Sequence, residues 1–354
     1  MTGPDAEPER VAVKRVNAED GSVNHKMVEQ EVFMLKGLQA LRNNSHTVPL
    51  YAMHLPDAGH PTDPAYLIMG LAEGKDVYSI CSAVNKAVLK AGPGPELQAL
   101  KAWAWQFSVQ MTCCLAEALR CCHTKGFYHR DLKPHNIVVS GWSGGKLQCK
   151  LVDWASGRTN KQTGRCNQMY TPEYASPEIV AEMSEGCSPM LEQPNDLWAW
   201  GVCLHQIFTC TSLSWQPAFG SVCGAPDGMS TDCIVRAQAS LSKEQASWAE
   251  ARAPWFAVPD DKVSGDKALD DKVPVALHRA PHPIIAGICQ AARFASADST
   301  TAEQAAGLID LLGGSQGLLH TTRESRILAR AVPKEHPWLS AAGCDCMPLC
   351  PIPL

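Results

Sequence analysis

The stretch Tyr128-His129-Arg130-Asp131-Leu132-Lys133-Pro134-His135-Asn136 places polar residues at fixed offsets between two apolar runs. The run before it ends at Gly126-Phe127, and the run after it, Ile137-Val138-Val139, has the β-branched composition of a strand. Within the stretch, Asp131 can take a proton from a hydroxyl, Lys133 can hold a phosphate and Asn136 can hold a metal ion. We therefore predict a loop that carries chemistry, set between a helix and a strand.

The composition of the whole chain narrows its class. Its 354 residues are 45% hydrophobic and 19% charged, which is ordinary for a globular protein of one two-lobed domain or two small domains. The net charge of −5 argues against a general nucleic-acid-binding role. Because we find neither a run of about 18 apolar residues nor an apolar N-terminal segment, we expect no membrane span and no signal peptide. The expected compartment is the cytoplasm or the nucleus.

The chain contains 16 cysteines, a high number. In a long chain for which no signal peptide is expected, we interpret them as reduced thiols that pack as small hydrophobic groups. Two adjacent pairs, Cys113-Cys114 and Cys121-Cys122, lie in a predicted helix, where neighbouring side chains point in different directions. We therefore expect these pairs to form neither disulfides nor a metal site.

Hydrophobic periodicity predicts the secondary structure. Strands are expected at residues 11–16, 48–53, 66–69, 137–139 and 147–152, and helices at 24–41, 97–124, 196–210, 284–294 and 301–312. In the first strand, alternation places Ala12 and Lys14 on one face and Val11 and Val13 on the other. Residues 70–76 are predicted to be a flexible connector, and residues 156–174 an exposed polar loop.

Several motifs follow one another in the order and spacing of the protein-kinase signature set. They are Val11-Ala12-Val13-Lys14, Glu31, Met69, Asp76, His129-Arg130-Asp131, Asp153-Trp154-Ala155, Ser176-Pro177-Glu178 and Asp196-x-Trp198-x-x-Gly201. Over residues 10–312 the chain thus resembles a eukaryotic protein kinase domain. The Lys133-Pro134 pair favours the serine/threonine class.

The resemblance implies an α+β, two-lobed, protein-kinase-like fold. The small lobe would hold a truncated antiparallel β-sheet and one helix, and the large lobe would be mainly helical. We expect the small lobe at residues 1–75, the large lobe at 76–312 and a weakly ordered tail at 313–354. The buried interior is expected to include Leu35, Leu50, His129 and Trp154, anchored by Asp196.

The resemblance also implies a role for each site residue, with ATP and Mg²⁺ as cofactors. The catalytic residues would be Asp131, which accepts the proton of the substrate hydroxyl, Lys133, which steadies the γ-phosphate, and Arg130, which links the loop to a phosphorylated residue. ATP would contact Lys14, Glu31, Ala12, Met69, Asp76 and Val138. Asn136 and Asp153 would bind the metal. Thr163 is the candidate phosphorylation site, with an unmodified polar loop as the alternative.

One part of the family pattern is missing. A Gly-x-Gly-x-x-Gly turn is expected before the lysine strand, and nothing before Val11 fits it. The chain is therefore expected to start inside the small lobe, which leaves Val11–Val16 as an exposed sheet edge where a partner strand could pair. We predict transfer of phosphate from ATP to serine or threonine of protein substrates. Two alternatives stay open, namely a catalytically impaired kinase that acts as a scaffold and an N-terminally incomplete kinase fragment.

Overall fold

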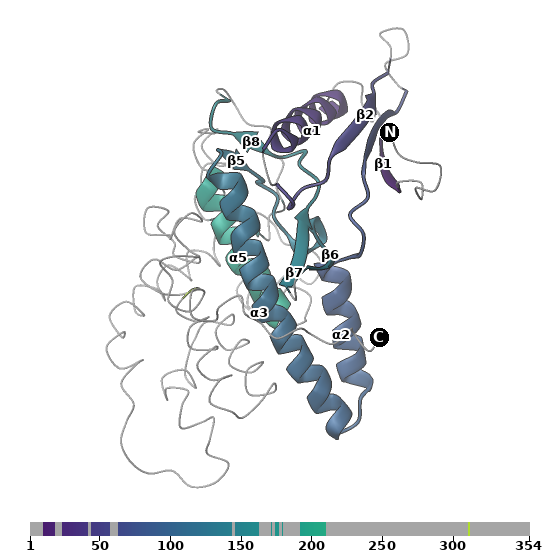
Figure 1. Ribbon diagram of the computed structural model, residues 1–354, viewed down its shortest axis with the longest axis vertical. Helices are drawn as coiled ribbons and strands as arrows, with labels where there is room; N and C mark the ends of the chain where they lie inside the picture. Colours follow the sequence, from purple (N-terminus) through teal and green to yellow (C-terminus); the bar gives the residue numbers. More distant parts are fainter. Residues whose placement is uncertain are drawn as a thin grey trace, which may run out of the picture.

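The computed structural model describes residues 10–17, 23–41, 44–56, 63–143, 146–162 and 192–209, together with 171, 174–176, 179 and 311. In the described part, a small antiparallel sheet with one helix lies at one end, and long helices run through the other (Figure 1). The expected α+β, two-lobed architecture is confirmed. Further short strands lie between these two groups of elements.

The small lobe is a three-stranded antiparallel sheet with the order β1-β3-β2 and one helix. Its strands are β1 (Val11–Val16), β2 (Leu50–His54) and β3 (Ala65–Gly70), and its helix is α1 (Val23–Gln39). The helix buries Val28, Val32 and Leu35, which recur at helical spacing. Strand β1 alternates between exposed and half-buried positions as predicted, with Val11 and Val13 on the exposed face.

Three helices carry most of the large lobe. They are α2 (Val77–Lys90), α3 (Pro95–His123) and α5 (Glu192–Thr209). The predicted stripe of α3 is buried throughout, at Trp103, Phe107, Met111, Leu115, Leu119 and Cys122. Helix α5 buries residues from Asn195 through Leu204, as its apolar composition predicts. In Figure 1, α3 and α5 lie alongside each other, and the edge-to-face contact of Trp105 with Phe208 joins them at a centroid distance of 4.9 Å.

Short strands support the loop between these lobes. Strand β6 (Ile137–Ser143) pairs with β7 (Lys146–Leu151) as an antiparallel hairpin, and with β4 (Lys75–Asp76) on its other side. A one-turn 3₁₀ segment, η1 (Pro134–Asn136), leads into β6. The strands β5 (Phe127–Tyr128) and β8 (Arg158–Thr159) form a separate antiparallel pair on the other side of the loop.

Gly126 follows the end of α3 and turns the chain towards Tyr128–Asn136, the predicted catalytic stretch. Its φ of 74° lies in the left-handed region, which glycine adopts without steric cost. Its backbone N–H donates to the carbonyl of His123 at 3.0 Å, which closes the last turn of the helix. A β-carbon at this position would lie 2.4 Å from the side chain of Asn160. Glycine therefore suits this corner, since any other residue would be strained at this φ and would require the Asn160 side chain to move.

Two predictions about connecting segments were wrong. Residues 70–76 include a paired strand, β4, and are followed by helix α2, which was not predicted. The segment 156–174 was expected to be an exposed loop, but its residues Arg158 and Thr159 form β8 and are 5% and 6% exposed. The pairing of β8 with β5 explains this burial, because it brings a polar sequence against the catalytic stretch.

Other expectations fall outside the described residues. They include the absent glycine turn, Thr163, Pro177 and Glu178, and the tail at 313–354. The helix predicted at 284–294 and nearly all of the one at 301–312 also fall there. None of the helices in the described part of the chain combines the length and apolar character that a bilayer span needs.

The burial of α3 predicts the effect of truncating its side chains. Leu119 is fully buried, so Leu119→Ala should lower the free energy of unfolding by about 2–5 kcal/mol through the cavity that it leaves. Leu89 is 77% exposed on α2, so the matched change Leu89→Ala should alter it by no more than about 0.5 kcal/mol. Urea denaturation of both variants measures the difference. Equal midpoints would show that α3 is not the centre of the core.

Candidate active site

The catalytic stretch is held by one buried carboxylate on α5. Asp196 is fully buried and accepts the backbone N–H groups of His129 and Arg130, each at 2.7 Å. Its Oδ2 also lies 2.9 Å from Nε2 of His123 at the end of α3. His129 in turn contacts the carbonyl of Val152 through Nε2 at 3.0 Å. The loop is thus fixed to α3, to α5 and to the residue that precedes Asp153.

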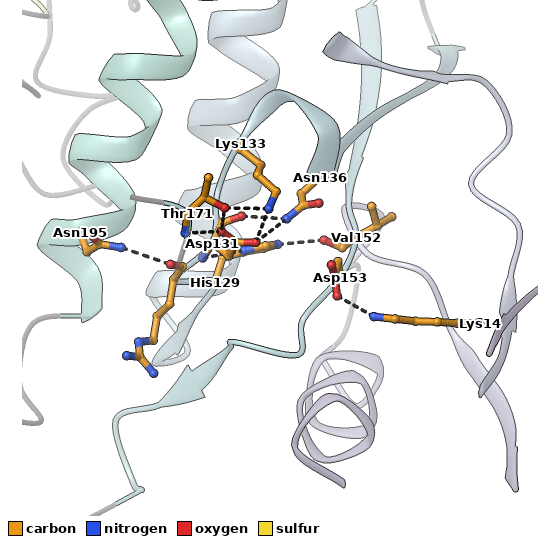
Figure 2. Close-up of polar contacts among 10 residues, drawn as sticks. Lys14, His129, Asp131, Lys133, Asn136, Val152, Asp153, Thr171 and Asn195 are labelled. Carbon is orange, nitrogen blue, oxygen red and sulfur yellow. Dashed lines mark hydrogen bonds and ion pairs between the residues drawn. The ribbon is translucent and has the colours of Figure 1, made fainter. Parts of the chain in front are cut away.

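Asp131 lies at the centre of a polar network (Figure 2). Lys133 Nζ lies 2.7 Å from its Oδ2, and the Thr171 hydroxyl donates to its Oδ1 at 2.6 Å. The side-chain amide of Asn136 donates to the backbone carbonyl of Asp131 at 2.8 Å. These contacts hold the Asp131 side chain in one orientation. The side chain is still 13% exposed, so it is accessible from solvent.

Lys14 contacts two carboxylates, Glu31 within the small lobe and Asp153 of the large lobe, and the second contact joins the lobes. Its Nζ lies 2.7 Å from Oε2 of Glu31 on α1 and 2.6 Å from Oδ1 of Asp153 in the large lobe. Figure 2 shows Lys14 reaching from the small lobe to Asp153. The predicted pairing of Lys14 with Glu31 is therefore present, and the same ammonium group also meets the proposed metal ligand.

These contacts shift the pKa values of all three groups. Burial lowers the pKa of Lys14, but the charges of Glu31 and Asp153 outweigh it, so the net pKa is raised. Burial raises the pKa of Glu31, and Lys14 offsets this only in part. Burial also raises the pKa of Asp153, but the ammonium group of Lys14 outweighs this effect, so the net pKa of Asp153 is lowered. Lys14 is thus charged and Asp153 ionised at neutral pH.

Two residues of the site adopt a backbone conformation that is unusual for non-glycine residues. The φ of Arg130 is 67° and that of Asp153 is 62°. Each such residue costs on the order of 1–3 kcal/mol and persists only where its surroundings fix it. For Arg130 the fixing contact is Asp196. Next to Asp153, the buried indole of Trp154 donates to the Leu151 carbonyl at 3.1 Å.

The remaining nucleotide candidates lie opposite one another in the paired strands. Ala12 on β1 faces Met69 on β3, and Asp76 on β4 faces Val138 on β6. The carboxylate of Asp76 also caps helix α2, where it accepts the N–H of Ser79 at 2.8 Å and its hydroxyl at 2.6 Å. Asp76 therefore has a structural role that the sequence analysis did not assign.

The two proposed metal ligands offer a suitable donor set. The Asn136 amide nitrogen donates towards Asp131, which leaves its amide oxygen as the ligand atom. Asp153 supplies an ionised carboxylate. Hard oxygen donors of this kind suit a divalent cation such as magnesium.

Sequence reasoning missed three contributors to the site. Thr171 donates to Asp131 and receives a hydrogen bond from Lys133 at 2.7 Å. His123 braces Asp196, and Asn195 accepts the N–H of Ser176 at 3.0 Å while contacting the Arg130 carbonyl. Thr171 lies 40 residues beyond Asp131, so no local spacing indicates their contact.

A sequence profile of the protein kinase domain matches residues 5–247, well over half of the chain. This chain belongs to the protein kinase family. Kinases of this family use ATP and a divalent metal, which agrees with the arrangement of Lys14, Asn136 and Asp153. The matched range contains the catalytic stretch and both lobes of the described structure.

Curated relatives give the class of this kinase. It is 29% identical over 248 residues to testis-specific serine/threonine-protein kinase 3 of Mus musculus. The aligned region covers 64% of this chain and 80% of the mouse protein. The Homo sapiens protein of the same name is 30% identical over 212 residues. This alignment covers 54% of this chain and 68% of the human protein. Serine/threonine-protein kinase zyg-8 of Caenorhabditis elegans is 27% identical over 201 residues, covering 56% of this chain but 21% of that protein. The chain is a serine/threonine protein kinase.

The environment of Asp196 predicts a pH dependence of stability. Burial acts to raise the pKa of Asp196, but the hydrogen bond and charge of His123 outweigh it, so the net pKa is lowered. A carboxyl group shifted in this direction stabilises the fold above its unfolded pKa of about 3.9, and this contribution is lost as the pH falls through the folded pKa. Asp196→Asn should therefore cost about 3–5 kcal/mol at pH 7 and progressively less below about pH 4.

Chemical denaturation at pH 7 and at several values below 4 measures this dependence. Asp76→Asn is the matched control, because asparagine caps a helix as well as aspartate does and the change should cost only a few tenths of a kcal/mol. A deficit of Asp196→Asn that stayed constant down to pH 2 would contradict the assignment.

Proposed function

We propose that this kinase domain is catalytically competent and transfers the γ-phosphoryl group of ATP, held with Mg²⁺, to serine or threonine hydroxyls of protein substrates. The observation that carries the proposal is the double contact of Lys14 with Glu31 and Asp153. It supports an aligned site, because a lysine so placed can bind phosphate oxygens while the carboxylate of Asp153 stays close to them.

Asp131 is the proposed proton acceptor. Phosphoryl transfer requires the substrate hydroxyl to be oriented in line with the γ-phosphate, and its proton must leave as the new P–O bond forms. Lys133 and Thr171 both contact the Asp131 carboxylate, which fixes the direction of its lone pairs. Lys133 is also positioned to neutralise charge on the transferred phosphoryl group.

Nucleotide and metal binding follow from the same arrangement. Ala12, Met69 and Val138 are the proposed apolar contacts of adenine, and Asp76 the proposed contact of ribose, beyond its role as a helix cap. Asn136 and Asp153 would hold Mg²⁺, which when bound neutralises charge on the phosphate oxygens.

Regulation and context extend the proposal. Arg130 is the proposed partner of a phosphorylated loop residue, with Thr163 as the candidate, since a guanidinium group binds phosphate through two hydrogen bonds.

We place the lobe boundary between residues 75 and 76, with a tail from 313, and the kinase in the cytoplasm or nucleus. Strand β1 forms one edge of its described sheet, and we propose that a further strand pairs with the backbone of Val11–Val16 there.

Loss of the proton acceptor should remove activity without removing nucleotide binding. Asp131→Asn should lower kcat by about 10²–10⁴-fold in an assay with Mg-ATP and a mixed peptide library. Mg-ATP at a hundred times its Kd should still stabilise the variant by about 2.7 kcal/mol in a thermal-shift measurement, because Asp131 is not assigned to nucleotide binding.

The exposed residue Asp63 provides the matched control, and Asp63→Asn should retain full activity. Two outcomes would overturn the proposal. Undiminished transfer by Asp131→Asn would remove Asp131 from the mechanism. Absence of both transfer and stabilisation in the unmodified chain would favour a scaffold that does not bind nucleotide.

The hydroxyl of Thr171 should matter for turnover. Thr171→Val removes hydrogen bonds to a carboxylate and an ammonium group, and bonds to charged groups contribute about 1.5–3 kcal/mol, so kcat should fall roughly 10- to 100-fold. Thr171→Ser keeps the hydroxyl and should stay within about threefold of the wild type. Steady-state kinetics compares the two variants, and equal losses would assign the effect to packing instead.

A further inference from the structure

A second group of potential metal ligands uses none of the active-site residues. His46, Cys114 and Cys149 are all buried, and one ligand atom from each lies within 4.8 Å of the other two. They come from the segment after α1, from α3 and from β7. His46 also forms a group of the same dimension with Glu117 and Cys121 of α3. The mechanism proposed above leaves these five side chains unassigned.

We propose that His46, Cys114 and Cys149 bind a Zn²⁺ ion at the junction of these three segments. Thiolate sulfur and imidazole nitrogen are the ligands that zinc prefers in proteins. Glu117 belongs to the neighbouring group with His46 and Cys121, so it shares His46 with the proposed site but does not lie within 4.8 Å of all three of its ligand atoms. The carboxylate of Glu117 also pairs with Arg120.

The distances suit a tetrahedral ion. With Zn–S bonds of about 2.3 Å and Zn–N bonds of about 2.0 Å, neighbouring ligand atoms of a tetrahedral site lie about 3.5 Å apart. The Sγ atoms of Cys114 and Cys149 are 2.7 Å apart, so binding requires them to separate by about 1 Å. They are not joined as a disulfide, whose S–S bond is about 2.05 Å. The described atoms thus need only a small adjustment.

His46 is already held in position for such a role. Its backbone carbonyl accepts the N–H of Leu151 at 2.8 Å, and its backbone N–H donates to the Asn44 side chain at 3.2 Å. Its ring Nδ1 lies 3.3 Å from the carbonyl of Cys149, a contact of the kind that orients metal-binding imidazoles. The ring therefore pays little entropy on binding an ion.

The protonation states define the chemistry of binding. Burial lowers the pKa of His46, so the imidazole is neutral at pH 7, which is its ligand form. The hydrogen bond from Cys114 and burial raise the pKa of Cys149, so without metal this group is a thiol. Each thiol releases its proton to solvent as its Zn–S bond forms, and no electron transfer is involved.

The ion would connect parts of the chain that are far apart in sequence. His46 lies 103 residues from Cys149, and Cys114 lies 35 residues from it. The segment of His46 follows α1, the helix that carries Glu31, and joins β7 through a parallel bridge between Thr47 and Leu151. Zinc would reinforce that junction and so steady the base of α1.

Cobalt substitution in the full-length chain tests the proposal. Tetrahedral Co²⁺ bound to thiolates gives charge-transfer absorption that oxygen-only sites lack. Cys114→Ser and Cys149→Ser should each lose one equivalent of Zn²⁺ by elemental analysis. They should also weaken Co²⁺ binding by more than the roughly 10- to 100-fold that loss of a residue behind a metal ligand costs. Cys113→Ser, at the adjacent half-buried position, is the matched control and should retain both the metal and the spectrum.

Three results would overturn the proposal. The first is metal content and spectra that are equal in all three variants. The second is a wild-type chain that shows no thiolate-to-cobalt absorption. The third is a Cys114–Cys149 disulfide, detected as two missing thiols in denatured, unreduced protein. If the variants do not fold, zinc-edge X-ray absorption of the wild type decides, since the site requires two sulfur ligands at about 2.3 Å and a four-sulfur shell contradicts it.

Discussion

The buried carboxylate of Asp196 is the contact on which the active site depends. It accepts two consecutive backbone N–H groups, those of His129 and Arg130, and thereby holds Arg130 at a positive φ. A non-glycine residue at such a φ costs on the order of 1–3 kcal/mol and persists only where its surroundings fix it, and here Asp196 supplies the fixing contact one residue before Asp131. Of the buried polar residues that the structure describes on α5, Asp196 and Asn195 contact this stretch, whereas Gln206 accepts the hydroxyl of Tyr174.

The sequence predicted best those parts that depend on local pattern. The alternation of Val11–Val16 and the long stripe of α3 gave the correct elements to within two residues, because burial on one face sets their periodicity. Helix α2 was missed although Val77, Ile80, Cys81 and Val84 follow helical spacing. The interpretation of Asp76 as a ribose contact hid its second role as the cap that starts this helix.

Contacts between distant segments could not be predicted from local pattern. The polar dipeptide Arg158-Thr159 has no strand signal of its own, and it is buried where it pairs with β5 and bonds to Gln162. Thr171 reaches Asp131 through tertiary structure alone. The contacts of the cysteines with distant segments could not be predicted from local pattern either. In each adjacent pair on α3 one cysteine is buried and the other half-buried, and Cys114 lies close to Cys149 and His46 from other segments.

The contact between Lys14 and Asp153 fixes the relative position of these two side chains but adds little to the stability of the fold. Their side chains are 32% and 43% exposed, so solvent screens the attraction and its contribution to folding is small. A second link runs beside it, in which Gln30 of α1 donates to the Gly157 carbonyl at 2.6 Å and also contacts Gln162. A displacement of α1 would therefore break the Glu31 pair and the Gln30 bonds together. Because each bond is weak alone but shares one rigid helix, the arrangement of Lys14 and Asp153 should respond cooperatively to the position of α1.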